Sequence, residues 1–88
     1  MTRYQRHSST LSTELGDEVI ALQLDTQFYY SLNSSAACVW RALGDGVDEE
    51  EATRALADHF GLEEDAARPH VTTLLAELLR LRLAEPTA

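Results

Sequence analysis

The chain has 88 residues, of which 44% are hydrophobic and 25% charged, and its formal net charge is −8 at pH 7. These values are typical of one soluble globular domain with a single small core. No apolar run approaches the roughly 20 residues of a membrane-spanning helix. We therefore expect no membrane partner. With 15 acidic residues against seven basic ones, all of them arginine, the composition also disfavours binding to nucleic acid.

Residue types that carry catalysis or hold metals are sparse. The single cysteine, Cys38, has no partner for a disulfide or a shared metal, and its apolar surroundings lack the base that a nucleophile needs. The three histidines lack the spacing of metal ligands. We therefore expect no enzyme activity, no cofactor and no metal site. The polar N-terminus lacks the apolar core of a signal peptide, which predicts a cytoplasmic protein.

Apolar periodicity predicts one structured domain with polar ends. Residues 1–9 contain two arginines and a histidine among few apolar side chains, and we expect them to form a flexible N-terminal arm. Residues 10–83 carry the periodic apolar patterns and make up the predicted domain. Residues 84–88 are expected to form a short C-terminal tail.

Three segments have the alternating pattern of strands. Residues 10–15 and 18–25 alternate apolar with polar or small side chains on either side of a Gly-Asp turn, which predicts an antiparallel pair. Residues 27–32 follow after Asp25-Thr26, a dipeptide that allows a tight return. The sequence therefore predicts a three-stranded antiparallel meander with the third strand at its edge.

The third predicted strand carries three consecutive aromatic residues, Phe28, Tyr29 and Tyr30. Alternation puts Phe28 and Tyr30 on the face of Leu32, and we expect this face to point inward because Leu32 leads directly into a helix. An edge strand exposes unpaired N–H and C=O groups, and an uncharged apolar edge either aggregates or pairs with a partner's strand. We favour strand addition; the alternative is that these aromatic side chains only fill core and surface.

Three helices are predicted after the strands, at residues 34–43, 48–61 and 64–82. Asn33 is a favoured N-cap for the first, and acidic residues fill the first turn of the second. Pro69 indicates that the third helix either bends or begins its regular part there. The predicted fold class is α+β, with a three-stranded antiparallel sheet followed by three helices in the order of a winged helix-turn-helix.

A winged helix-turn-helix raises DNA binding as an alternative function, with the third helix in the recognition position. The start of that helix, which would face the base edges, carries Glu63, Glu64 and Asp65. Carboxylates at this position repel the phosphate backbone, so a DNA-binding regulator is the less favoured alternative.

A longer pattern joins the aromatic strand to the first helix. It reads Phe28-Tyr29-Tyr30-x-Leu32-Asn33-x-x-Ala36-x-x-x-Trp40-x-x-Leu43-x-x-Gly46. This pattern resembles the PqqD family, whose members bind precursor peptides. The similarity extends from Val19 to Leu83, and the segment from the aromatic strand to the tryptophan is its specific part. Within that family, a stand-alone chain of this size and acidity, such as this one, most resembles the recognition elements of lasso-peptide biosynthesis.

The resemblance implies a non-catalytic domain that binds the leader of a ribosomally made precursor peptide. Such a domain delivers the leader to a cysteine-protease-like leader peptidase and an ATP-dependent cyclase. The leader would add antiparallel to the third strand and rest against the third helix. Lasso leaders commonly carry a Tyr-x-x-Pro pattern, whose tyrosine we expect to be the main anchor, and acidic residues would attract a basic leader. The expected peptide-binding residues are Asp25, Gln27, Phe28, Tyr29, Tyr30, Ser31, Arg68, His70, Val71, Leu74, Leu75 and Leu78.

The resemblance also implies a second alternative, a PqqD-type peptide chaperone for a radical SAM maturase. The chain departs from the family in two places. Thr26-Gln27 stands where a glycine often precedes the aromatic pair, and Pro69 stands where a helix former is usual. Thr26-Gln27 leaves the type of hairpin turn open, and Pro69 affects the end of the expected groove that lies near the start of the third helix.

Overall fold

The computed structural model describes residues 1–87. Its strands are β1 (Arg3–Arg6), β2 (Thr10–Leu15), β3 (Glu18–Gln23), β4 (Phe28–Leu32), β5 (Val47–Asp48) and β6 (Ala84–Pro86). Its helices are α1 (Ser34–Ala42), the short 3-10 helix η1 (Leu43–Asp45), α2 (Glu49–Phe60) and α3 (Glu64–Arg80). The prediction of a three-stranded antiparallel sheet followed by three helices is confirmed. Within the described residues, no helix is long and apolar enough to cross a membrane.

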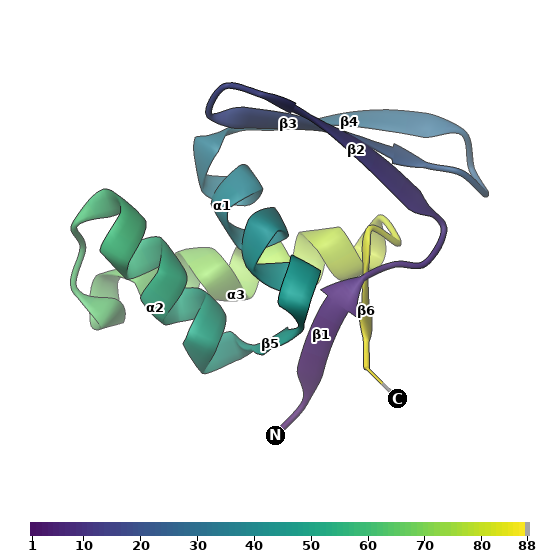
Figure 1. Cartoon of the computed structure of the whole chain (residues 1–88). Helices are drawn as coiled ribbons and strands as arrows, with labels where there is room; N and C mark the ends of the chain where they lie inside the picture. The colour runs from purple at the N-terminus through teal and green to yellow at the C-terminus, as the bar shows by residue number, and fades with distance from the viewer. Residues whose placement is uncertain (88) are drawn as a thin grey trace.

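The main sheet has the order β2-β3-β4, with both pairs antiparallel. It forms a layer over α1 and α3 (Figure 1). Val19 and Ala21 of β3 are fully buried on its inner face, and the register places Leu32 and Tyr30 of β4 beside them. The face of β4 that was predicted to point inward therefore does so, although its burial decreases from Leu32 through Tyr30 to Phe28, which is 63% exposed.

A second sheet, in the order β5-β1-β6, corrects the predictions for both ends of the chain. Residues 1–9 are not a flexible arm, because β1 is the central strand of this sheet and pairs antiparallel with β5 and β6. Most of the predicted C-terminal tail is likewise structured as β6, while Ala88 lies outside the described residues. The partner strands of β1 are more than 40 residues away in sequence, so no local sequence pattern could predict this sheet.

The core lies where the two sheets and the three helices meet, around α1. Trp40 is 1% exposed and donates its indole N–H to the Ser12 hydroxyl at 3.2 Å, while Val39 and Leu43 are fully buried. The guanidinium of Arg6 lies 4.8 Å from the centre of the Trp40 ring, and its Nε donates to the Trp40 carbonyl at 3.0 Å. β1 is therefore attached to the core through the largest buried side chain.

Local signals fix the ends of the helices. The Asn33 side chain accepts from the Ala36 N–H at 3.0 Å, as expected for the N-cap of α1. Asp48 and Glu51 form a reciprocal capping box at the start of α2, and Gly61 ends that helix with a left-handed φ of 65°. α3 is helical from Glu64 through Pro69 to Arg80, so its regular part does not begin at the proline.

Candidate peptide-binding groove

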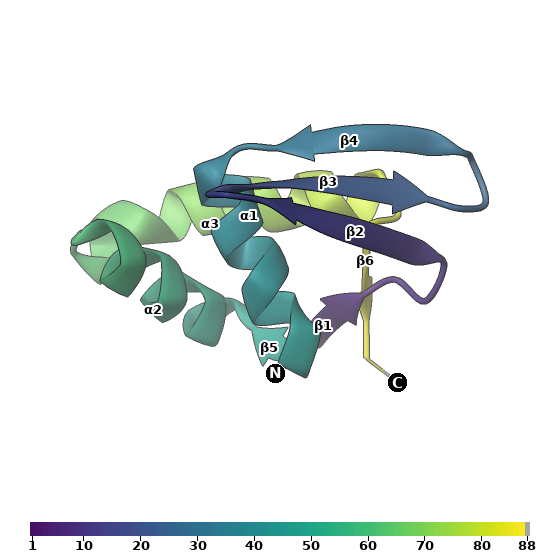
Figure 2. The same ribbon diagram turned by 45° about the horizontal axis from the view of Figure 1, so that its top comes forward.

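The outer edge of β4 is open within residues 1–87, because β4 pairs only with β3 in the order β2-β3-β4 (Figure 2). The Leu24 N–H donates to the Ser9 carbonyl at 2.8 Å, which assigns the even-numbered positions of β3 to hydrogen bonding with β2. The odd-numbered positions of β3 then bond to the even-numbered residues of β4. Consequently, the backbone N–H and C=O groups of Tyr29 and Ser31 point toward the open edge.

The β3–β4 turn is held by a buried glutamine. Gln23, which is fully buried, donates its side-chain amide to the Arg82 carbonyl at 3.0 Å. Its side-chain oxygen accepts from the backbone N–H groups of Asp25 and Thr26 at 2.6 and 3.3 Å. Gln27 completes the turn with a left-handed φ of 63°, the conformation that glycine adopts most easily. The turn is thus joined to the chain just after α3.

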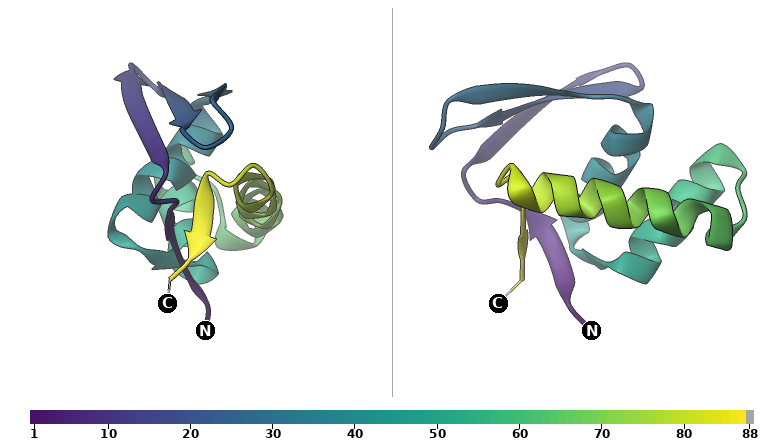
Figure 3. Two further views of the ribbon diagram at one scale, coloured as in Figure 1. Left: turned by 90° about the vertical axis from the view of Figure 1, so that its right-hand side faces the viewer. Right: turned by 180° about the vertical axis from the view of Figure 1, so that it is seen from behind.

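A groove of about 260 Å³ lies between β4, the start of α1 and the C-terminal half of α3. Figure 3 (right) shows α3 running alongside β4 below the sheet. The buried side chains of Leu32 and Leu78 and the half-buried side chains of Tyr30, Leu74 and Leu81 give the groove an apolar lining. The groove lies beside an edge with free backbone donors and acceptors, so the two features together suit an extended peptide with apolar side chains.

Charged side chains surround the C-terminal end of this groove. Glu77 lines the groove and accepts a hydrogen bond from Nε of Arg80 at 3.0 Å. This hydrogen bond lowers the pKa of the Glu77 carboxyl below its ordinary value. Asp25 lies 3.8 Å from the Arg82 guanidinium, between the β3–β4 turn and the end of α3. Of these charged residues, only Glu77 lines the groove itself.

Only part of the predicted peptide-binding set lines the groove. Tyr30, Ser31, Leu74 and Leu78 do so, and Tyr29, 71% exposed, lies on the same edge strand with its side chain on the outer face. Phe28 shares the inner face with Tyr30, and the two rings pack edge to face with their centres 6.5 Å apart. Asp25 and Gln27 lie in the turn that ends the open edge.

Four residues predicted on α3 lie elsewhere. Val71 and Leu75 are 0% and 3% exposed in the core, because their side of α3 packs inward, so they do not line the groove. Arg68 pairs with Asp65 at 3.0 Å and lies 3.9 Å from Glu50 of α2. His70 lines a separate hollow beyond the start of α1. The groove is therefore displaced toward the C-terminus of α3 from its predicted position.

Sequence reasoning missed the residues that complete the lining. Asn33 and Ala36 contribute from the start of α1, Glu77 contributes from α3, and Leu81 is the C-cap residue that follows α3. Leu81 lies seven residues after Leu74, which puts the two on one face of a helix, so its spacing was a usable signal. The bond of Gln23 to the chain beyond α3 had no sequence signal.

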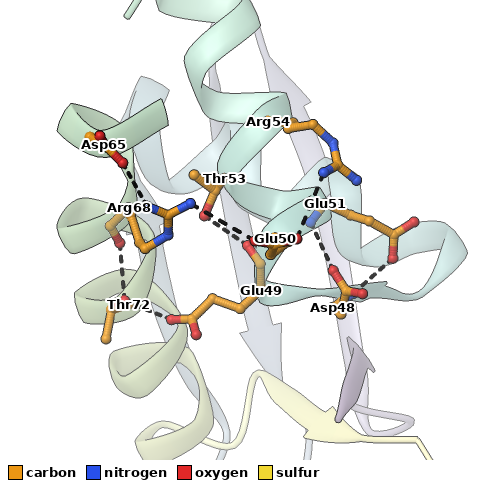
Figure 4. Close-up of polar contacts among 9 residues, drawn as sticks. All are labelled: Asp48, Glu49, Glu50, Glu51, Thr53, Arg54, Asp65, Arg68 and Thr72. Carbon is orange, nitrogen blue, oxygen red and sulfur yellow. Dashed lines mark hydrogen bonds and ion pairs between the residues drawn. The ribbon is translucent and has the colours of Figure 1, made fainter. Parts of the chain in front are cut away.

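The acidic start of α2 has contacts of its own (Figure 4). The Thr72 hydroxyl of α3 donates to the Glu49 carboxylate at 2.6 Å, and Glu50 lies within 4.0 Å of both Arg54 and Arg68. Asp48 and Glu51 are occupied by the capping box. These acids therefore link α2 to α3 and cap α2.

Comparison with known proteins agrees with this architecture. The sequence matches the family model described as Coenzyme PQQ synthesis protein D (PqqD) over residues 18–84. No curated protein is similar enough in sequence to match the chain. A solved structure described as "TbiB1 in Complex with the TbiA(beta) Leader Peptide" is similar, with a TM-score of 0.85 and 24% sequence identity, and the match covers 96% of this chain and 98% of that one. This likeness shows a shared fold. Because the family match runs from the start of β3 to the start of β6, the chain belongs to the PqqD family, as its resemblance indicated.

Proposed function

We propose that this protein is a non-catalytic recognition element that binds the leader region of a ribosomally made precursor peptide. The observation that carries the proposal is the open edge of β4 lying directly beside the apolar groove. Support comes from membership of the PqqD family and from the shared fold with TbiB1, a protein whose solved structure holds a leader peptide.

The backbone of the leader pairs antiparallel with β4. Tyr29 and Ser31 together offer two N–H donors and two C=O acceptors, and each hydrogen bond contributes about 0.5–1.5 kcal/mol net. These bonds orient the leader without selecting its sequence. Leader residues opposite Tyr29 and Ser31 point to the outer face of the sheet, and the residues between them point inward beside Tyr30.

Selectivity then comes from the inward side chains of the leader. An aromatic anchor fits the lining of Tyr30, Leu74 and Leu81, and burying it contributes ~2 kcal/mol or more. We assign this position to the tyrosine of the Tyr-x-x-Pro pattern common in lasso leaders. The net charge of −8 favours the approach of a basic leader over an acidic one.

The bound leader is then presented to a cysteine-protease-like leader peptidase and an ATP-dependent cyclase of a cytoplasmic lasso-peptide pathway. A PqqD-type chaperone for a radical SAM maturase would use the same groove, so the partner enzyme distinguishes the two functions. Tagged protein incubated with its leader should retain the peptidase in a pull-down. Retention of a radical SAM enzyme instead would support the chaperone function.

Fluorescence polarisation with a labelled leader peptide that carries the Tyr-x-x-Pro pattern and basic residues tests the proposal directly. Leu74→Asp puts a carboxylate into the apolar groove and should abolish leader binding. The matched control Glu50→Ala, on α2, should leave the affinity unchanged. Unchanged affinity in a folded Leu74→Asp protein would exclude this groove as the leader site.

A further inference from the structure

A second apolar hollow, of about 290 Å³, lies on the other side of the α1 N-terminus from the groove. It is lined by Ser35 of α1, Leu56 and Phe60 of α2, Leu62, and His70 of α3. Phe60 and Leu62 are large apolar residues, yet they are 40% and 42% exposed. The imidazole of His59 packs edge to face on the Phe60 ring, with the ring centres 4.7 Å apart. His59 is not among the residues that line the hollow.

One face of α3 connects the two sites. His70 lines the hollow, and Leu74, Leu78 and Leu81 line the groove. Spacings of four, eight and eleven residues from His70 place these side chains in one stripe along the helix. On the facing wall, Ala36 lines the groove while its neighbour Ser35 lines the hollow. The two cavities therefore lie one after the other along the same face of α3.

The direction of strand pairing determines which end of a leader reaches the hollow. β4 runs from the β3–β4 turn toward α1, as Figure 3 (right) shows. A leader that pairs antiparallel with β4 runs the opposite way, and its N-terminal side passes the start of α1. The hollow is thus N-terminal to the paired segment of the leader, whereas Asp25 and Arg82 lie at its C-terminal end.

The separation along α3 sets the spacing between two anchors. From His70 to the middle of the groove lining is about seven residues of α3, which corresponds to roughly 11 Å at 1.5 Å per residue. An extended peptide covers this length in about three to four residues. One leader can therefore occupy both cavities without a gap in its backbone.

We propose that this hollow is a second anchor site for the leader, and this inference rests on the proposed function. It takes an aromatic side chain three to four residues N-terminal to the side chain in the groove. Leu56, Phe60 and Leu62 contact the ring, with Phe60 able to meet it edge to face. Ser35 and His70, which also line the hollow, provide hydrogen-bond partners for a phenol or indole. Occupation also covers the exposed apolar surface of Phe60 and Leu62.

Two labelled peptides test the inference by fluorescence polarisation. The first is a leader that carries the Tyr-x-x-Pro pattern and an aromatic residue three to four positions before its tyrosine, and the second is the same leader truncated just before its paired segment. The full leader should bind at least tenfold more tightly than the truncated one. Leu62→Ser and Phe60→Ser should each weaken binding of the full leader by about tenfold and leave the truncated leader unaffected. Leu11→Ser, at an exposed apolar residue on the outer face of the sheet, should change neither affinity.

The outcomes separate this inference from the function on which it rests. Equal affinity of the two peptides, together with loss of both in Leu74→Asp, would overturn the second anchor site and retain the groove. Failure of the unaltered protein to bind either peptide would overturn the proposed function. Thermal melting by circular dichroism identifies any variant that has lost its fold. Leu62→Ser and Phe60→Ser must both weaken binding of the full leader for the second anchor site to stand.

Discussion

The two three-stranded sheets of this protein protect their edges to different degrees. In the β5-β1-β6 sheet the outer strands have only two and three residues, and β6 ends in Pro86. In the main sheet, the β2 edge carries the inward-facing Glu14, which accepts hydrogen bonds from Arg41 of α1 at 3.0 and 2.7 Å. Short strands, proline and inward charges all discourage pairing with another chain.

The β4 edge has none of these devices. Its five residues, Phe28–Leu32, include no charge and no proline, and two of its aromatic side chains are mostly exposed. An unprotected edge risks aggregation and persists where a partner uses it. The contrast teaches that the edge left available for pairing is the one that borders the groove.

The largest expected effect comes from closing the β4 edge. Ser31→Pro removes an N–H that points outward, and its ring obstructs an added strand, so leader binding should be lost while the melting temperature changes little. Tyr30→Pro is the matched comparison, because its N–H belongs to the ladder with buried Ala21, and breaking that bond should cost about 1–3 kcal/mol of stability. Polarisation and thermal melting measure the two effects, and full-strength leader binding by Ser31→Pro would contradict the pairing scheme.

The second sheet should contribute stability without contributing to binding. Arg6→Ala removes both the bond to the Trp40 carbonyl and the stacking on its ring, and we expect the free energy of unfolding to fall by about 1–3 kcal/mol. Leader affinity of the folded variant should be unchanged. Arg54→Ala, which removes an exposed ion pair at 4.0 Å, should change stability by less than about 0.5 kcal/mol. Urea denaturation measures both; equal stabilities would show that β1 is not held through Arg6.

A smaller effect is expected at the turn that precedes β4. Gln27→Gly relieves the left-handed backbone of a residue with a side chain, and stability should rise by about 0.5–1 kcal/mol. Gln5→Gly, in the extended backbone of β1, should instead lower stability by a similar amount. Chemical denaturation of the two variants gives the comparison, and a stability loss in Gln27→Gly would mean that the side chain of Gln27 matters more than its backbone conformation.

The smallest effect concerns the protected β2 edge and depends on pH. The hydrogen bond from Arg41 lowers the pKa of the Glu14 carboxyl in the folded protein. The resulting stability is fully present above the pKa of the unfolded chain and is lost as pH falls through the lowered folded value. Glu14→Gln should therefore reduce the acid-side loss of stability, measured by melting temperatures from neutral to acid pH. Identical pH profiles for the variant and the unaltered protein would argue against this ion pair.

Sequence predicted the elements whose signals are local. Asn33, the Asp48–Glu51 capping box and Gly61 each act within one helical turn, and the helix ends that depend on them fall close to the expected places. The alternation in residues 10–32 likewise gave the meander and the inward face of β4. The specific segment from Phe28 to Trp40 identified the family.

Features that depend on distant partners were not predictable in this way. β1 looks polar in sequence, and its strand character depends on β5, on β6 and on the burial of Arg6 against Trp40. On α3, apolar residues occupy both the core face and the groove face. Spacing alone did not show that Val71 and Leu75 lie on the core face and that Leu81 lies on the groove face. The rotation of α3 about its axis is set by packing against α1 and α2.

The buried side chain of Gln23 influences the width of the groove. Its side chain bonds the β3–β4 turn on one side and the Arg82 carbonyl on the other, so the two long walls of the groove are joined through one fully buried amide. A substitution at this position would alter the spacing between β4 and α3 without touching any residue that meets a ligand. Engineering of leader preference can therefore begin at Gln23 as well as at the residues that line the groove.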